Sequence, residues 1–150
     1  MTQGFDIVVS PEVAAIRIEE LIEQLACSDF LFTERVLRQS VQSGNLFQLL
    51  DKTESLKLDI YPRELIPGEL QRFETMELFA GVFLPVVSRT DAAISKLIWI
   101  VKGSHRSRRD FRSIFRCGSE QQQADIRDQA RQLRLSELLE ELLSDSDEIR

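Results

Sequence analysis

The chain has 150 residues, of which 43% are hydrophobic and 29% are charged, and its formal net charge at pH 7 is −6. This length and composition are typical of one globular domain with a real core, and the six glycines and four prolines are too few for a linker-rich protein. The negative charge opposes non-specific binding to nucleic acid or to an anionic membrane by the molecule as a whole, and it leaves room for a local basic patch.

The cysteine and histidine content limits the metal chemistry and indicates the compartment. Cys27 and Cys117 lie far apart in the sequence, and His105 is the only histidine. Zinc and haem sites built from cysteine and histidine are therefore excluded. The start of the chain lacks a secretory signal, and its most apolar stretch, residues 92–101, is too short to cross a bilayer. We expect a cytoplasmic protein with reduced thiols and no membrane partner.

The first elements are a strand and two helices. Residues 5–9 alternate and are rich in β-branched side chains, which predicts a strand. Residues 10–12 combine an N-cap serine, a proline at the first helical position and an acid, and they predict one helix that continues to about Cys27. A second helix is expected over residues 33–41, before a break at residues 43–45.

The middle of the chain favours strands. Residues 46–50 and 56–61 are two strand candidates joined by a polar turn. The second places Leu56, Leu58 and Ile60 on one face and Lys57, Asp59 and Tyr61 on the other. Residues 73–87 predict one or two further strands, with Gly81 marking a turn.

The rest of the chain favours helices. A helix capped by Thr90 and Asp91 is expected to end near residue 103, and further helices are expected over residues 106–116, after residue 119 and over residues 135–143. The fold class is therefore α+β, with a mixed sheet in the N-terminal half and a helical C-terminal half. We expect a single domain over residues 1–144, composed of halves 1–87 and 88–144, followed by an acidic tail, residues 145–150.

Two carboxylates stand out in this pattern. Asp6 and Asp59 each lie on the polar face of an otherwise apolar strand. If the two strands are neighbours, the carboxylates could converge and bind a hard divalent cation such as Mg²⁺. Phosphoryl and nucleotidyl transfer use such an arrangement, because the metal offsets charge on the phosphates. The alternative is that both are ordinary solvated carboxylates on the wet face of a sheet.

Several segments resemble a known family. They occur in the family's order and span nearly the whole chain: residues 2–9, 46–51, 57–60, 88–97, 109–114 and 133–143. Together they are similar to the minimal nucleotidyltransferase-fold superfamily, in the branch of abortive-infection and toxin-type nucleotidyltransferase-like proteins of bacteria. The last three resemble the segment that opens the C-terminal helices, the Arg-Asp helix and the closing helix of that branch.

The resemblance implies specific roles and specific losses. In that family a Gly-rich turn holds the nucleotide phosphates, two acids at alternating positions of the next strand bind metal, and a later strand supplies a third acid. Carried over, Asp6 matches the second acid and Asp59 the third, as metal ligands and catalytic residues. The first acid falls on Gly4, and this sequence lacks the strand and turn that precede Thr2 in the family. We therefore expect a catalytically incomplete relative, a pseudoenzyme that acts in binding or regulation.

The missing first strand also predicts how the chain assembles. A sheet without its first strand would expose an edge, and an exposed edge can pair with a second copy of the chain. We therefore expect a homodimer.

Positive side chains in the second half are candidates for nucleotide or phosphate binding. His105, Arg109, Arg112 and Arg116 share one face of a predicted helix. The alternative is a solvated face balanced by Glu137, Glu140 and Glu141, or an internal pair between Arg109 and Asp110. Lys96 could approach the site or anchor the helical half; otherwise its stem packs along the helix and its ammonium reaches water.

Two other functions stay open beside the incomplete relative. One is a Mg²⁺-dependent nucleotidyltransferase that transfers NMP to RNA or protein, with Asp6 and Asp59 as metal ligands and Lys96, Arg109 and Arg112 near phosphate. The other is a module that binds RNA or protein through the arginine face, which predicts binding that is sensitive to salt.

Overall fold

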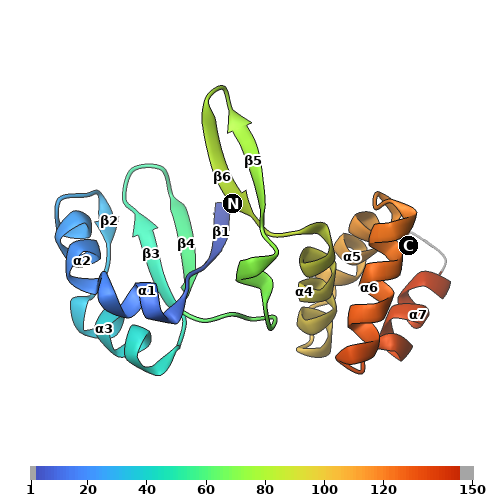
Figure 1. Cartoon of the computed structure of the whole chain (residues 1–150). Coiled ribbons are helices and arrows are strands. Elements are labelled where there is room, and N and C mark those ends of the chain that lie inside the picture. Colours follow the sequence, from blue (N-terminus) through green and yellow to red (C-terminus); the bar gives the residue numbers. More distant parts are fainter. Residues whose placement is uncertain (1–2, 146–150) are drawn as a thin grey trace. The chain divides into compact units, whose positions relative to one another are not determined.

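The computed structural model describes residues 3–145. Thr2, the first residue of the family-like segments, and residues 146–150 of the expected acidic tail lie outside the described residues. The α+β class confirms the sequence prediction, with the sheet in the N-terminal half and most helices in the C-terminal half. The chain divides into two compact units between Leu70 and Gln71 (Figure 1). This boundary groups the hairpin at residues 74–86 with the helices, whereas the sequence analysis grouped it with the sheet.

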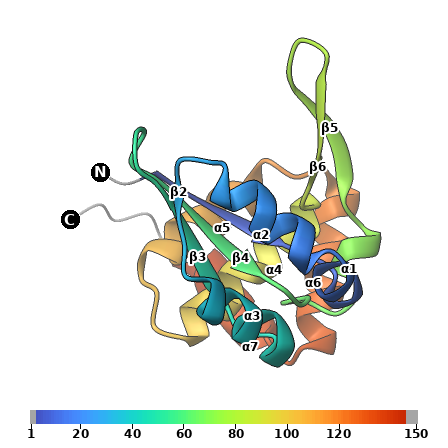
Figure 2. The same cartoon turned by 90° about the vertical axis from the view of Figure 1, so that its left-hand side faces the viewer.

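A four-stranded mixed sheet forms the centre of the first unit, in the order β1-β4-β3-β2 (Figure 2). Its strands are β1 (Gln3–Val8), β2 (Phe30–Leu31), β3 (Phe47–Asp51) and β4 (Leu56–Tyr61). β1 runs parallel to β4, whereas β3 is antiparallel to both β4 and β2. The two strands with the candidate carboxylates are therefore neighbours.

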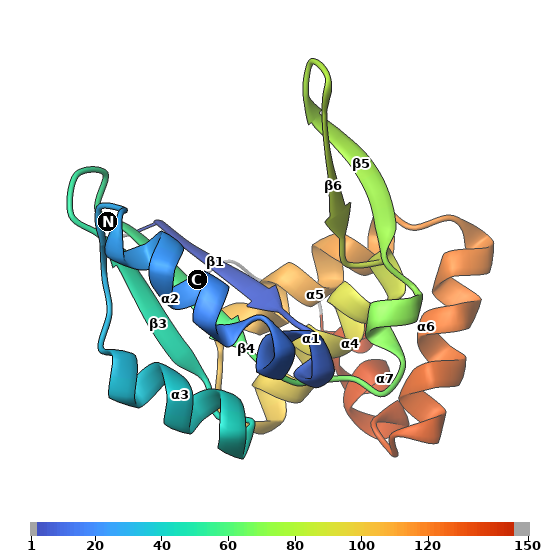
Figure 3. The ribbon, with the colours of Figure 1, turned by 60° about the vertical axis from the view of Figure 1, so that its left-hand side comes forward.

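Three helices, α1 (Pro11–Ile16), α2 (Ile18–Ala26) and α3 (Glu34–Ser43), lie on one face of this sheet (Figure 3). Ser10 caps α1 as expected, because its hydroxyl accepts a hydrogen bond from the Val13 N–H. The expectation of one continuous helix to Cys27 is wrong: the backbone leaves helical geometry at Arg17 (φ −102°, ψ 14°). α1 buries no residue whereas α2 places Leu25 in the core, so the break lets the two segments meet the sheet differently.

The alternation of the strands separates an apolar face from a polar one. Phe47, Leu49 and Ile60 of the sheet pack with Leu25 of α2 and Leu37 of α3 to form the core of the first unit. Because successive strand residues point to opposite faces, the other face holds the polar positions of the strands. Those positions are Gly4, Asp6, Gln48, Lys57, Asp59 and Tyr61.

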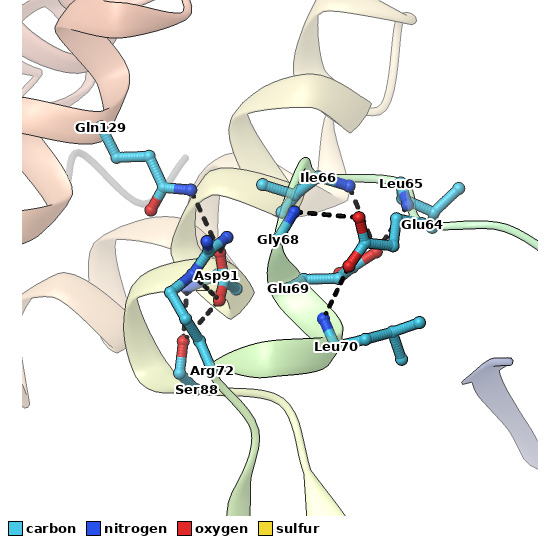
Figure 4. A network of polar contacts seen from close by, with 10 residues as sticks. All are labelled: Glu64, Leu65, Ile66, Gly68, Glu69, Leu70, Arg72, Ser88, Asp91 and Gln129. Carbon is cyan, nitrogen blue, oxygen red and sulfur yellow. Dashed lines mark hydrogen bonds and ion pairs between the residues drawn. The ribbon is translucent and has the colours of Figure 1, made fainter. Parts of the chain in front are cut away.

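Two glutamates organise the turn that ends the first unit. The Glu69 carboxylate accepts hydrogen bonds from the N–H groups of Leu65 and Ile66, and Glu64 accepts from those of Gly68 and Leu70 (Figure 4). A short 3-10 turn, Glu69–Gln71, follows directly. The side chains thus satisfy backbone donors that no strand or helix would satisfy here.

The second unit begins with an exposed hairpin. β5 (Glu74–Phe79) and β6 (Val82–Val86) are antiparallel around Gly81, whose φ of 76° suits glycine. This confirms two strands and the expected turn. Every strand residue except Val86 is exposed, and Figure 1 shows the hairpin extending away from the helices of its unit.

Four helices complete the second unit: α4 (Arg89–Val101), α5 (Arg106–Arg116), α6 (Glu120–Gln132) and α7 (Ser136–Ser144). The expected cap at Thr90 and Asp91 is displaced, because Ser88 is the N-cap and its hydroxyl accepts from the Asp91 N–H. α6 begins with a capping box between Ser119 and Gln122. α4 packs on α5 and α6, and α5 and α6 pack on α7.

The fully buried carboxylate of Asp91 joins three parts of the second unit. Arg72, at the entry to the hairpin, donates Nε to Oδ2 (2.9 Å) and Nη2 to Oδ1 (2.8 Å). Ser88 Oγ donates to Oδ2 (2.8 Å), and Gln129 of α6 donates to Oδ1 (3.1 Å) (Figure 4). Burying a charge is costly unless it is paired and hydrogen-bonded, and Asp91 meets both conditions.

No helix within residues 3–145 combines the length and the apolar character that a membrane-crossing segment needs.

Candidate functional site

The register of β1 and β4 brings the two candidate carboxylates together. Asp6 and Asp59 are paired residues of the parallel ladder, so their side chains leave the same face of the sheet side by side. This face is opposite the one that α1, α2 and α3 cover. The strand arrangement that a shared cation site requires is therefore present.

A lysine and a glutamine complete the surroundings of Asp59. Lys57 Nζ lies 3.0 Å from Asp59 Oδ2, and Gln48 Nε2 of β3 donates to Asp59 Oδ1 at 2.9 Å. The Asp59 side chain is only 15% exposed, so this ion pair is better shielded than an ordinary surface pair. Both carboxylate oxygens of Asp59 thus already have a donor.

Gly4 lies beside the Lys57 side chain. Gly4 pairs with Lys57 across the ladder, and a Cβ at Gly4 would lie 3.6 Å from the Lys57 Cε. That distance is ordinary van der Waals contact, so the Lys57 stem passes over the position that would hold the family's first acid. The Lys57 side chain therefore lies beside the position where the resemblance implies the family's first acid.

The negative charges of this face affect the pKa of Tyr61. It is buried at the end of β4, on the same face as Asp59. Burial raises the pKa of the Tyr61 phenol, and the charges of Asp6 and Asp59 raise it further. Both effects therefore favour the protonated phenol over the phenolate.

These side chains do not fit the metal centre that the resemblance implies. Two carboxylates and one ammonium sum to one negative charge, and a cation at Asp59 would compete with Lys57 for the carboxylate oxygens. Within residues 3–145, no group of three or more His, Cys, Asp or Glu side chains is arranged to hold a metal ion. A pair of magnesium ions needs more carboxylate oxygens than Asp6 and Asp59 offer.

Lys96 belongs to the second unit and has a partner there. Its Nζ lies 3.2 Å from Asp110 Oδ2, which ties α4 to α5. Of the interpretations of Lys96, this contact favours an anchor for the helical half. Asp110 thus pairs with Lys96 rather than with its neighbour Arg109, consistent with the rule that adjacent helix residues do not face each other.

Arginines of α5 and α6 pair with acids near the C-terminal end of the described residues. Arg108 pairs with Glu141 (3.0 Å) and lies 3.6 Å from Asp145. Glu140 pairs instead with Arg127 of α6. Arg109 is exposed and has no ion pair within residues 3–145, whereas Arg112 is half-buried. The two expected phosphate-binding arginines therefore differ in accessibility.

Lys57 and Gln48 are site residues that were not predicted from the sequence. The alternation of residues 56–61 had already placed Lys57 on the face of Asp59, and residues 47–49 show the same alternation around Gln48. What the pattern lacked was the register between β3 and β4, which sets Gln48 opposite Asp59.

No family model matches the chain, and no curated protein matches it.

Proposed function

We propose that this chain is a nucleotidyltransferase-like protein that has lost nucleotidyl transfer and acts through binding. The observation that carries the proposal is the Lys57–Asp59 ion pair beside Gly4. An ammonium neutralises part of the charge that would hold a divalent cation, and the first of the family's acids has no side chain.

The electrostatics of the site support the loss of transfer. Without a cation, the net negative charge of Asp6, Lys57 and Asp59 repels a triphosphate. Without a third carboxylate, a cation that displaces Lys57 would be held loosely. The positioning that makes such transfers fast is therefore missing from this face.

The first experiment compares transfer and metal binding in matched variants. Wild-type protein is incubated with Mg²⁺, labelled nucleoside triphosphates, and RNA or protein acceptors, and we expect no label transfer. Mn²⁺ binding is measured by calorimetry for the wild type and for the double variant Gly4→Asp with Lys57→Met. We expect the double variant to gain Mn²⁺ affinity at least tenfold, because it restores a carboxylate and removes the competing ammonium.

One outcome would contradict the proposal and favour the enzyme alternative. Label transfer by the wild type that disappears in Asp59→Asn would identify a Mg²⁺-dependent nucleotidyltransferase. Lys57→Met alone serves as the control, because it removes the ammonium without adding an acid.

The exposed Arg109 favours phosphate groups of RNA as the bound partner. We expect a short single-stranded RNA to bind with a salt dependence of about −0.7 in the log–log slope for each phosphate contact. Arg109→Gln should reduce the magnitude of that slope by about 0.7, the value for one phosphate contact. Arg131→Gln removes an exposed arginine that is already paired with Asp128, and it should leave the slope unchanged. A slope that is equal in all three proteins would exclude this partner.

The proposal extends to assembly and compartment. β1 pairs only with β4 among the described strands, so its outer edge offers backbone groups to a second copy of the chain. We expect light scattering to give a dimer at micromolar concentration, and a monomer would refute it. Cys27 and Cys117 are exposed thiols, as expected in a reducing cytoplasm.

A further inference from the structure

The first unit contains a cavity of about 330 Å³ that opens to solvent. Its floor is the apolar face of the sheet, with Phe47 and Leu49 of β3 and Ile60 of β4. Its walls come from the three helices that cover this face, including Ala14 of α1, Leu21 of α2 and Val41 of α3. The cavity is thus on the opposite face of the sheet from Asp6 and Asp59.

The floor of the cavity consists of core residues of the first unit. Phe47, Leu49 and Ile60 retain 5%, 5% and 8% exposure, although they are central core residues of their unit. Protein interiors normally pack as densely as organic crystals, and voids larger than a water molecule are few. An apolar cavity of this volume instead falls in the range of small-molecule binding sites.

The rim limits the charge of what the cavity can hold. Arg17 and Glu20 both line it and bind each other in a bidentate pair, through Nε–Oε2 (2.8 Å) and Nη2–Oε1 (2.7 Å). Their charges therefore cancel at the rim. Gln24 also lines the cavity, and its amide can donate and accept a hydrogen bond.

We propose that this cavity binds a small neutral molecule with an apolar body and one hydroxyl or carbonyl group. At roughly 30 Å³ for each small-molecule group, the volume accommodates roughly ten non-hydrogen atoms. The apolar body lies on Phe47, Leu49 and Ile60, and the polar group bonds at the rim beside Gln24. This site goes beyond the proposed function and does not depend on it, because it uses the other face of the sheet.

The test uses 1-octanol as the probe and two variants that fill the cavity from opposite walls. Ala14→Leu extends a side chain from α1, and Val41→Leu extends one from α3. Ala15→Leu is the matched control, because Ala15 is exposed on the same helix and does not line the cavity. Binding is followed by amide chemical shifts in the full chain, and circular dichroism checks that each variant folds.

We expect the wild type and Ala15→Leu to bind 1-octanol saturably, with a dissociation constant on the order of 0.1 mM. The shifts should centre on the segments that line the cavity in α1, α3 and β3. Each cavity-filling variant should weaken binding at least tenfold and raise the melting temperature.

Three results would overturn the proposal. The first is no saturable binding by the wild type below 1 mM octanol. The second is shifts confined to the exposed hairpin, residues 74–86. The third is unchanged binding in the folded cavity-filling variants, and either variant suffices for this comparison if the other fails to fold.

Discussion

The sheet core of the first unit faces a cavity, whereas the helical core of the second unit contains several fully buried residues. In the second unit Ile94, Leu97, Phe111 and Ile126 are 0% exposed, and four helices enclose them from several sides. In the first unit the corresponding sheet residues retain some exposure and face an open cavity. A cluster of helices can surround its core on all sides. A sheet that helices cover on one face leaves its other face, and the gaps between those helices, available for binding.

The candidate sites are divided unevenly between the two units. The polar cluster of Asp6, Lys57 and Asp59 and the apolar cavity both lie in the first unit, on opposite faces of one sheet. The second unit contributes a closed core and the exposed Arg109.

The largest expected effect compares matched truncations in the two cores. Leu97→Ala should reduce the free energy of unfolding by about 3–4 kcal/mol, because it opens a void in a closed core. Leu49→Ala should cost about 2 kcal/mol, because the cavity already removes contacts on one side of Leu49. Trp99, the only tryptophan, reports urea unfolding of the second unit, and hydrogen exchange in β3 and β4 reports the first. Equal losses would remove the contrast between the cores.

A second comparison concerns charges. Asp91→Asn should cost the second unit about 2–3 kcal/mol, because it weakens a buried pair with Arg72 and disturbs the bonds from Ser88 and Gln129. Asp128→Asn, which breaks an exposed pair with Arg131, should cost less than about 0.5 kcal/mol. Urea denaturation followed by Trp99 fluorescence measures both. Similar values for the two variants would show that the Asp91 network contributes little.

The Asp91 carboxyl also predicts how the stability of the second unit depends on pH. Burial alone would raise the pKa of Asp91, but hydrogen bonds from Arg72, Ser88 and Gln129 and the charge of Arg72 outweigh burial and lower the pKa below 3.8. A lowered folded pKa means that the stabilisation is complete above pH 3.8 and is lost as the pH falls through the folded value. As the pH is lowered below 3.8, the urea midpoint measured by Trp99 fluorescence should fall in the wild type and should fall less in Asp91→Asn. Parallel pH profiles would contradict this assignment.

The smallest expected effect probes the polar face of the first unit. Tyr61 is the only tyrosine, so its ionisation can be followed by ultraviolet absorbance. Asp6→Asn should lower the pKa of the Tyr61 phenol toward its ordinary value, because a nearby negative charge is removed. Asp29→Asn changes an exposed acid that does not contribute to the shift, and it should leave the titration unchanged. An unaltered pKa in Asp6→Asn would place Asp6 farther from Tyr61 than the register indicates.

Local patterns predicted most of the elements. The helix over residues 106–116 has its expected bounds, because buried Ser107, Phe111 and Phe115 recur at a spacing of four residues. The break at Arg17 was missed because the apolar spacing continues across it. The cap at Ser88 was missed because Thr90 and Asp91 have the same chemistry as an N-cap.

The candidate site was predictable only in part. The alternation around Asp59 placed its side chain and that of Lys57 on one face, and the resemblance drew attention to Asp6 and Gly4. Nothing in the local pattern showed that Gln48 lies opposite Asp59 or that Lys57 reaches across Gly4. Both contacts depend on the register between strands that are distant in sequence.

The sequence alone thus determined most of the strands and helices, although not β2 or the break at Arg17, and the face of the strand on which each carboxylate lies. These properties follow from periodicity within a few residues, which the backbone geometry of strands and helices imposes. The tertiary structure decided that Asp6 pairs with Asp59, that the Lys57 side chain lies beside the position implied for the family's first acid, and that a cavity lies between the sheet and the helices of the first unit. These features arise where distant segments meet, and packing and strand register, rather than local periodicity, govern such meetings.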